Sequence, residues 1–149
     1  MIDNKFSIIL PTYNRGDSYL RDAINSVVDQ SYTNWELIII DNNSNDCTDS
    51  LIESFSNDKI KLYKINNAGN IAKSRNLGII KSTGNYISFL DSDDIWKRNK
   101  LEIQLAHFKK NNYKISHTSY EIIDINNKRI SVRKAKNFNS YKDLLKSCD

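Results

Sequence analysis

Residues 6–15, FSIILPTYNR, carry a short apolar run that passes directly into polar residues. An apolar run of this length closed by Pro11 is typical of a buried strand. The next apolar residues fall at i, i+3, i+4, i+7 and i+8, the spacing of one helix face: Leu20, Ala23, Ile24, Val27 and Val28. Asp17 or Ser18 is a suitable N-cap for that helix. The stretch therefore predicts a buried strand, a polar loop and a helix.

The same alternation continues along the chain. Further strands are expected at residues 36–40, 59–65 and 85–90, and further helices at about 51–55, 71–81 and 97–111. Residues 114–125 and 129–133 then predict a hairpin around an Asn-Asn turn, and residues 140–148 favour the start of a last helix. Alternating strands and helices predict an α/β fold with a mostly parallel sheet and helices on both faces. A length of 149 residues suits one domain, 1–149.

Composition excludes several classes of protein. A hydrophobic fraction of 39% is too high for a disordered chain. The longest aliphatic run, Leu37 to Ile40, is far too short for a membrane-spanning helix. We expect no signal peptide, because the first residues lack a basic region followed by an apolar stretch. Cys47 and Cys148 predict two unpaired thiols in a reducing cytoplasm rather than a disulfide framework or a zinc site.

The charges are divided unevenly along the chain. Residues 1–94 carry 9 basic and 13 acidic side chains, whereas residues 95–149 carry 13 basic and 5 acidic ones. A basic second part could attract a membrane surface, a phosphorylated acceptor or nucleic acid, or it could simply be a solvated surface. Because its basic residues are not interleaved with aromatic ones, we expect no nucleic acid partner.

Three of the expected strands end in unusually polar loops, at residues 11–15, 41–46 and 91–94. Ligands of open α/β sheets bind at the carboxyl ends of the strands, so these three loops should meet at one crevice. Each loop alone has a simpler explanation, because Asp and Asn favour turns and helix caps. Three such loops on one edge of a sheet favour a binding site.

The densest of these loops is Asp91-Ser92-Asp93-Asp94. Three carboxylates in four residues repel one another unless a cation lies between them. Carboxylate oxygens suit Mg²⁺ or Mn²⁺, and Mg²⁺ usually takes one or two carboxylates together with substrate phosphates. We therefore expect a divalent ion that joins the protein to a phosphorylated ligand. The sequence has no EF-hand, no GxGxxG and no Walker A loop, so side chains and a metal would hold the nucleotide.

Four motifs carry a resemblance to a known family: SIILPTYNR, IIIDNNSNDCTD, NxGNIAKSRNLG and YISFLDSDDIW. In this order and spacing the chain resembles the glycosyltransferases of family 2, which have the GT-A fold, a Rossmann-like nucleotide-binding domain. The resemblance covers nearly the whole chain. Residues 1–94 would hold the nucleotide and metal motifs, and residues 95–149 would form a basic helix, a hairpin and a tail.

The resemblance implies roles for particular residues. Pro11, Thr12 and Tyr13 would line the nucleotide base, with Tyr13 stacking on it. Arg15 would lie near the diphosphate or the base, and Asp41 would accept a hydrogen bond from the uracil N–H. Arg75, in the segment that the family usually writes Ala-Arg-Asn, would bind the base or the phosphates. Asp91 and Ser92 would bind the nucleotide sugar. Asp93, together with Asp91, would bind the metal. Trp96 and Asp94 have simpler readings, as a packing residue and as a possible helix cap.

The resemblance also implies an activity. It is the inverting transfer of a sugar from a nucleotide diphosphate sugar, commonly a UDP-sugar, to an acceptor hydroxyl in polysaccharide or O-antigen synthesis, with Mn²⁺ or Mg²⁺. The acceptor would be a saccharide or a lipid-linked sugar, met in the cytoplasm at the inner face of the membrane. Glu121 and Asp124 come too early to match the family's general base, which we expect beyond Asp149. The chain is thus expected to be a donor-binding part that is truncated before the acceptor-binding part.

Two other classes of function compete with a self-sufficient transferase. A nucleotide-sugar-binding module that works only with a partner chain would bind the donor without turnover. A phosphoacceptor domain of the response-regulator type is also doubly wound, but it would need an acidic pair where this chain has PTYNR.

Overall fold

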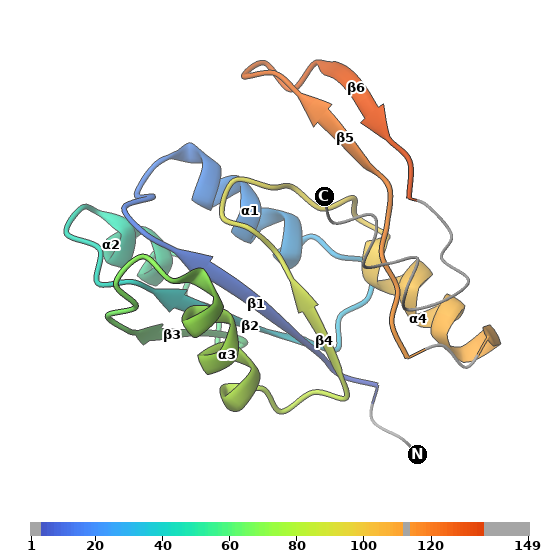
Figure 1. The fold of residues 1–149 in the computed structure, drawn as a ribbon, viewed down its shortest axis with the longest axis horizontal. Helices are drawn as coiled ribbons and strands as arrows, with labels where there is room; N and C mark the ends of the chain where they lie inside the picture. The colour runs from blue at the N-terminus through green and yellow to red at the C-terminus, as the bar shows by residue number, and fades with distance from the viewer. Residues whose placement is uncertain (1–3, 112–113, 136–149) are drawn as a thin grey trace.

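A computed structural model describes residues 4–111 and 114–135 of the chain. Four parallel strands form the central sheet in the order β3-β2-β1-β4. Their bounds are β1 (Phe6–Thr12), β2 (Trp35–Asp41), β3 (Ile60–Lys64) and β4 (Tyr86–Phe89). The helices are α1 (Ser18–Val28), α2 (Thr48–Glu53), α3 (Ile71–Lys81) and α4 (Lys100–Asn111). The arrowheads of the strands point the same way in Figure 1, so their carboxyl ends share one edge.

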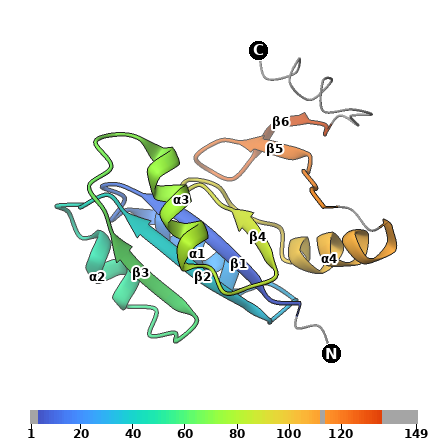
Figure 2. The same cartoon turned by 60° about the horizontal axis from the view of Figure 1, so that its bottom comes forward.

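Helices cover both faces of this sheet, as the alternation predicts. On one face, α1, α2 and α4 enclose the larger core with the sheet residues Phe6, Ile8, Leu10, Leu37 and Ile39. On the other face, α3 packs across β1 and β2, over Ile9, Ile38 and Ile40. Figure 2 shows α3 in front of the sheet and α1 behind it. The mostly parallel α/β fold with helices on both faces is therefore confirmed.

The contact between α3 and the sheet depends on small residues. Ser74 and Gly78, four residues apart, are the buried residues of α3. A Cβ atom at Gly78 would lie 2.4 Å from Ile9 Cγ2, so the helix can approach β1 this closely only with glycine there. Because α3 lies over β1 and β2, the edge strand β4 keeps Ile87 and Phe89 exposed on that face among the described residues.

The strand β1 is longer than its sequence predicts, because it continues through Pro11 to Thr12. The prediction that Pro11 closes the strand was wrong for a geometric reason. The carbonyl of Ile9 accepts a hydrogen bond from Leu90, so Ile9 and Pro11 direct their backbone groups toward β4. Since β4 pairs with β1 only as far as Ile9, the missing N–H of Pro11 costs no ladder hydrogen bond.

A separate two-stranded sheet follows α4. β5 (Tyr120–Ile123) and β6 (Arg129–Arg133) pair antiparallel, and all of their residues are exposed. This hairpin stands apart from the central sheet in Figure 1. The predicted hairpin is confirmed, but residues 114–119 are not strand, and the last helix expected at 140–148 lies outside the described residues. No helix within residues 4–111 and 114–135 is long and apolar enough to cross a membrane.

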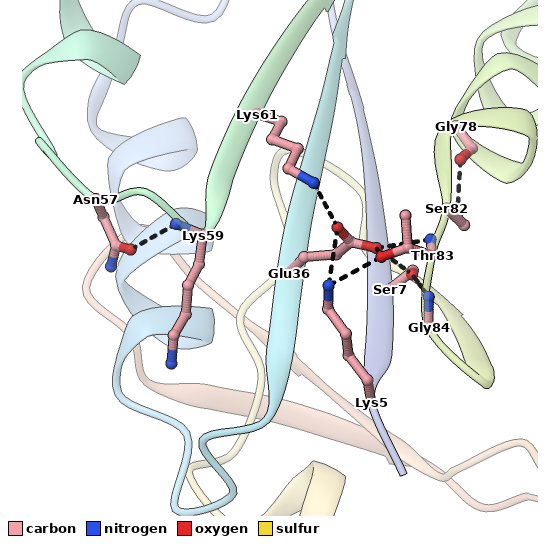
Figure 3. A network of polar contacts seen from close by, with 10 residues as sticks. All are labelled: Lys5, Ser7, Glu36, Asn57, Lys59, Lys61, Gly78, Ser82, Thr83 and Gly84. Carbon is pink, nitrogen blue, oxygen red and sulfur yellow. Dashed lines mark hydrogen bonds and ion pairs between the residues drawn. The ribbon is translucent and has the colours of Figure 1, made fainter. Parts of the chain in front are cut away.

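A buried carboxylate holds the amino ends of the strands together (Figure 3). Glu36, at the start of β2, is 1% exposed. Its Oε1 atom accepts hydrogen bonds from the Ser7 hydroxyl at 2.7 Å and from both the backbone N–H and the hydroxyl of Thr83 at 2.8 Å. Its Oε2 atom lies 2.8 Å from Lys61 Nζ and 3.2 Å from Lys5 Nζ. One side chain therefore joins β1, β2, β3 and the turn before β4.

These partners decide the charge of Glu36. Burial alone would raise the pKa of this carboxyl. Hydrogen bonds from Lys61, Ser7 and Thr83 outweigh burial and hold the pKa well below its ordinary value of 4.5. A lowered pKa in the folded state means that Glu36 stabilises the fold above that ordinary value and loses this contribution as the pH falls below it.

We expect Glu36→Gln to lower the free energy of unfolding at pH 7 by about 2–3 kcal/mol, because the lysines and hydroxyls lose their charged acceptor. Denaturant unfolding at pH 7, 4 and 3 measures it, and the difference from the unmodified chain should shrink below pH 4.5. Glu53→Gln, on the exposed surface of α2, is the matched control. A loss that is equal at every pH would contradict this role.

Candidate functional site

The polar loops predicted to meet do meet at the carboxyl edge of the sheet. A hollow of about 270 Å³ opens there between the ends of β1 and β2, the loop before α3 and the loop after β4. Four of its lining residues were predicted from the sequence: Pro11, Thr12, Tyr13 and Ser92. Five were not: Asn42, Asn67, Gly69, Ile71 and Ser74. The hollow lies where the order of the sheet reverses around β1, which is where open α/β sheets bind ligands.

The loop after β1 is fixed against the loop after β2. Asn14 donates its backbone N–H to Ser44 Oγ at 2.8 Å, and its side-chain oxygen accepts from the backbone N–H of Asn45 at 3.0 Å. Gly16 donates its N–H to Asp46 at 2.9 Å, and a Cβ atom there would lie 2.4 Å from Cys47 Sγ. The loop thus presents Tyr13, whose side chain is 57% exposed, on a rigid support.

Asp17 ends this loop and begins α1. Its Oδ1 atom accepts the backbone N–H groups of Tyr19 and Leu20, so the predicted N-cap is Asp17 rather than Ser18.

Asp41, at the end of β2, is not among the residues that line the hollow. It is fully buried, and Ser44 occupies both of its carboxylate oxygens. The Ser44 backbone N–H donates to Oδ2 at 2.9 Å, and the Ser44 hydroxyl donates to Oδ1. The neighbouring Asn42 lines the hollow instead. In this arrangement Asp41 shapes the loop that carries Asn42.

Asn67 lines the hollow, although it was not predicted from the sequence as a site residue. It is 6% exposed, and its backbone N–H donates to Asn42 Oδ1 at 2.8 Å. Its amide donates to Ser74 Oγ at 2.8 Å, and its side-chain oxygen accepts from Gly69 N–H at 2.7 Å. Gly69 has a positive φ of 80°, which glycine adopts without strain. An Asn- and Gly-rich stretch directly before a helix was the available signal, and it reads equally well as an ordinary turn.

Thr12, which lines the same hollow, has an unsatisfied polar atom. The residue is 5% exposed, and its hydroxyl has no hydrogen-bond partner. Burying a hydroxyl without a partner costs free energy, and most buried hydroxyls are paired. An unpaired buried hydroxyl at a residue that lines a hollow is consistent with a ligand-binding position in the free protein.

Two arginines from different elements contact the acidic motif. Arg75, on α3, donates from Nη2 to Asp91 Oδ1 at 2.7 Å. Arg15, after β1, lies 3.4 Å from Asp93 Oδ2. Asp94 has no ion pair among the described residues, and its backbone N–H donates to the carbonyl of Asp91. Burial, together with the nearby Asp91 and Asp93 carboxylates, raises the pKa of Asp94.

The donor set of this motif fits a divalent ion in one specific way. No group of three or more His, Cys, Asp or Glu side chains within the described residues is arranged to hold a metal by itself. The chain can offer one or two carboxylates here, from Asp93 and Asp91, on either side of Ser92, which lines the hollow. That is the ligand set that Mg²⁺ accepts when phosphate oxygens and waters complete its coordination.

A larger hollow, of about 690 Å³, lies apart from these residues. It is bounded by α1, by Ile95, Trp96 and Arg98 after the acidic motif, and by Asn127 at the tip of the hairpin. It contains none of the predicted site residues. Trp96 also packs on the main core, which agrees with its reading as a packing residue.

Comparison with known proteins identifies the family. The family described as glycosyl transferase family 2 matches residues 7–148. The chain belongs to glycosyltransferase family 2. The match covers the hollow, both arginines and the acidic motif.

Individual proteins agree with this assignment. The chain is 40% identical over 148 residues to the UDP-Glc:alpha-D-GlcNAc-diphosphoundecaprenol beta-1,3-glucosyltransferase WfgD of Escherichia coli, covering 99% of this chain and 58% of WfgD. Staphylococcus aureus TarS 1–349 in complex with UDP-GlcNAc superposes with a TM-score of 0.67 and 26% identity, covering 83% of this chain and 41% of TarS. The mannosyltransferase PcManGT from Pyrobaculum calidifontis in complex with GDP-Man and Mn²⁺, at 21% identity and a TM-score of 0.60, shares the fold; 76% of this chain and 34% of that one are covered.

These comparisons confirm the GT-A fold and the glycosyltransferase family. The chain spans 58% of the length of WfgD and less of the two solved structures.

Thr12→Val tests whether the unpaired hydroxyl is kept for a reason other than stability. The substitution replaces the hydroxyl with a methyl group of similar size, so we expect the free energy of unfolding to rise by about 1 kcal/mol. Thr12→Ser keeps the hydroxyl and is the control; it should not gain stability. Thermal and denaturant unfolding measure both variants. A Thr12→Val protein that is clearly less stable would mean that the hydroxyl has a structural partner.

Proposed function

We propose that this chain binds the sugar donor of an inverting glycosyltransferase that uses a UDP-sugar. The observation that carries the proposal is the unpaired buried hydroxyl of Thr12, a residue that lines the hollow beside the acidic motif. The UDP-GlcNAc named for TarS and the UDP-Glc named for WfgD support UDP as the nucleotide. The acceptor would be a lipid-linked saccharide, as the name of WfgD describes for that enzyme, in polysaccharide or O-antigen synthesis.

The walls of the hollow suggest how the base would be held. The exposed ring of Tyr13 offers a stacking surface, and Pro11 adds an apolar contact. Thr12, Asn42 and Asn67 offer hydrogen-bonding groups at the same position. Asp41 is fully buried and hydrogen-bonded to Ser44, so it would accept the uracil N–H only if the Ser44 hydroxyl turned away when the nucleotide binds.

The acidic motif would hold the diphosphate end. Asp93, with Asp91, would bind Mn²⁺ or Mg²⁺, and Ser92 would face the nucleotide sugar from the wall of the hollow. A divalent ion at this position would offset the negative charge on the departing diphosphate. Arg75 would remain beside Asp91 and complement the phosphates, because guanidinium groups match their geometry.

Transfer requires a base that deprotonates the acceptor hydroxyl. Glu121 forms ion pairs with Lys97 at 3.0 Å and with Arg129 at 3.8 Å, and these hold its pKa below the ordinary range, which does not suit a general base. We therefore expect this chain alone to bind the donor and to transfer sugar slowly or not at all, since losing base catalysis typically costs 10²–10⁴-fold. A donor-binding module that works with a partner chain is the second candidate, favoured if binding is strong and turnover is absent.

Calorimetry with UDP tests the donor site. We expect binding in the presence of Mn²⁺ that weakens at least tenfold in EDTA, because the ion would join Asp93 to the diphosphate. Asp93→Asn should produce a similar loss in Mn²⁺, and Thr12→Val should weaken binding in both conditions. Asp58→Asn, an exposed position at the opposite edge of the sheet, is the control. Binding that is indifferent to metal and to Asp93 would contradict the metal assignment, and no binding at all would contradict the donor site.

The hairpin offers a surface for contact with a membrane, where a lipid-linked acceptor would lie. It carries Lys128, Arg129, Arg133 and Lys134, and of these only Arg129 has a carboxylate partner among the described residues. Exposed apolar side chains lie on the same segment: Ile122, Ile125, Ile130 and Val132. Basic residues near an anionic bilayer contribute about 1 kcal/mol each, and exposed apolar residues add to this by burial in the interface.

Charge reversal of Lys128, Arg129, Arg133 and Lys134 together tests this contact. We expect binding to vesicles that contain anionic lipid to fall at least tenfold in a sedimentation assay, with weak binding to neutral vesicles throughout. Reversal of Lys109 and Lys110, which are exposed on α4, is the control and should have a smaller effect. Unchanged sedimentation with anionic vesicles after hairpin reversal would count against the contact.

A further inference from the structure

Arg15 occupies a position between two carboxylates. Its Nη2 atom lies 3.4 Å from Asp93 Oδ2, and its Nη1 atom lies 3.5 Å from Asp17 Oδ2. Its guanidinium carbon also lies 5.8 Å from the centre of the Tyr19 ring. All three charged side chains are more than a third exposed, and both contacts are long, so neither ion pair holds Arg15 firmly.

Asp17 is a second ion-pair partner for Arg15. Its Oδ1 atom caps α1, which fixes the carboxylate in place, and its Oδ2 atom remains for Arg15. If Arg15 left Asp93, it would keep the contacts with Asp17 and Tyr19. The guanidinium can therefore move away from the acidic motif without losing every partner.

Arg75 is exposed to the same extent as Arg15, but its ion pair is shorter. Its contact with Asp91 is short, at 2.7 Å, and its guanidinium carbon lies 5.8 Å from the centre of the Phe89 ring. Its Nε atom is buried and has no hydrogen-bond partner. Of the two carboxylates that the proposed function assigns to the metal, Asp91 thus has the closer cation, at 2.7 Å, and Asp93 the more distant one, at 3.4 Å.

We propose that Arg15 is a built-in counter-cation of Asp93 that a nucleoside diphosphate draws away, so that bound nucleotide strengthens metal binding at Asp93. The inference rests on the proposed donor site. A diphosphate beside the motif attracts Arg15 more strongly than the single Asp93 carboxylate does, because it carries more negative charge and accepts a bidentate contact. Once Arg15 has turned to the diphosphate, the full charge of Asp93 is available to a divalent ion.

This arrangement has a thermodynamic consequence. Without nucleotide, a metal ion must compete with Arg15 for Asp93, so its affinity is reduced. The two binding steps form a closed thermodynamic cycle. If bound nucleotide raises the affinity for metal by some factor, bound metal therefore raises the affinity for nucleotide by the same factor. Removing the Arg15 charge should therefore raise the affinity for metal alone and shrink the factor by which the two ligands assist each other.

The test is a titration of Mn²⁺ followed by electron paramagnetic resonance, with and without UDP. In the unmodified chain we expect weak Mn²⁺ binding that UDP strengthens. Arg15→Gln should bind Mn²⁺ about two- to fivefold more tightly without UDP, the range expected for one exposed ion pair, and the gain from UDP should be smaller. Arg15→Lys, which keeps the charge, should remain close to the unmodified chain.

Arg21→Gln removes an equivalent exposed charge from α1 and is the matched control; it should leave both affinities unchanged. Circular dichroism establishes that each variant is folded. Arg15→Gln with unchanged or weaker Mn²⁺ binding in the absence of UDP would overturn the inference while leaving the donor site intact. Failure of the unmodified chain to bind UDP with or without Mn²⁺ would overturn the proposed function and this inference with it.

Discussion

The carboxylate of Glu36 sets the arrangement on which the rest of this structure depends. It is buried at the amino end of β2, and its hydrogen bonds and ion pairs reach β1, β3 and the turn before β4. Such a group is tolerated in the interior only when partners satisfy it completely, so an alternative register of any of these strands would leave it unpaired. Because the strands are aligned at this end, Thr12 and Asp41 lie side by side at the other.

Each end of β2 therefore carries a buried acidic residue, Glu36 or Asp41, and the two residues have different roles. Glu36 is surrounded by donors that fix its charge and its position. The Asp41 carboxylate accepts its hydrogen bonds among the described residues from Ser44 alone, which belongs to the loop after β2. Glu36 therefore joins several elements of the sheet, whereas Asp41 fixes the conformation of a single loop.

Much of this could be predicted from local patterns. The order of strands and helices follows from the spacing of apolar residues, and the meeting of three loops follows from the parallel sheet. Local patterns could not predict the features that depend on contacts between residues distant in the sequence. Pro11 fits inside β1 because β4 ends early, which its own neighbours do not reveal. Glu36 reads as an ordinary first residue of a strand, and Asn67 as a turn residue, until Ser7, Thr83 and Ser74 are placed around them. The ion pair of Arg15 with Asp93 joins residues 78 positions apart.

The outer edge of β4 has a consequence for how this polypeptide behaves in solution. Among the described residues β4 has no neighbour on that side, and Ile87 and Phe89 stay exposed beside it. Unpaired backbone groups flanked by large apolar side chains are a template to which another extended segment can add. At high concentration this edge is where self-association of the isolated polypeptide would begin, by extension of the sheet from one molecule into the next.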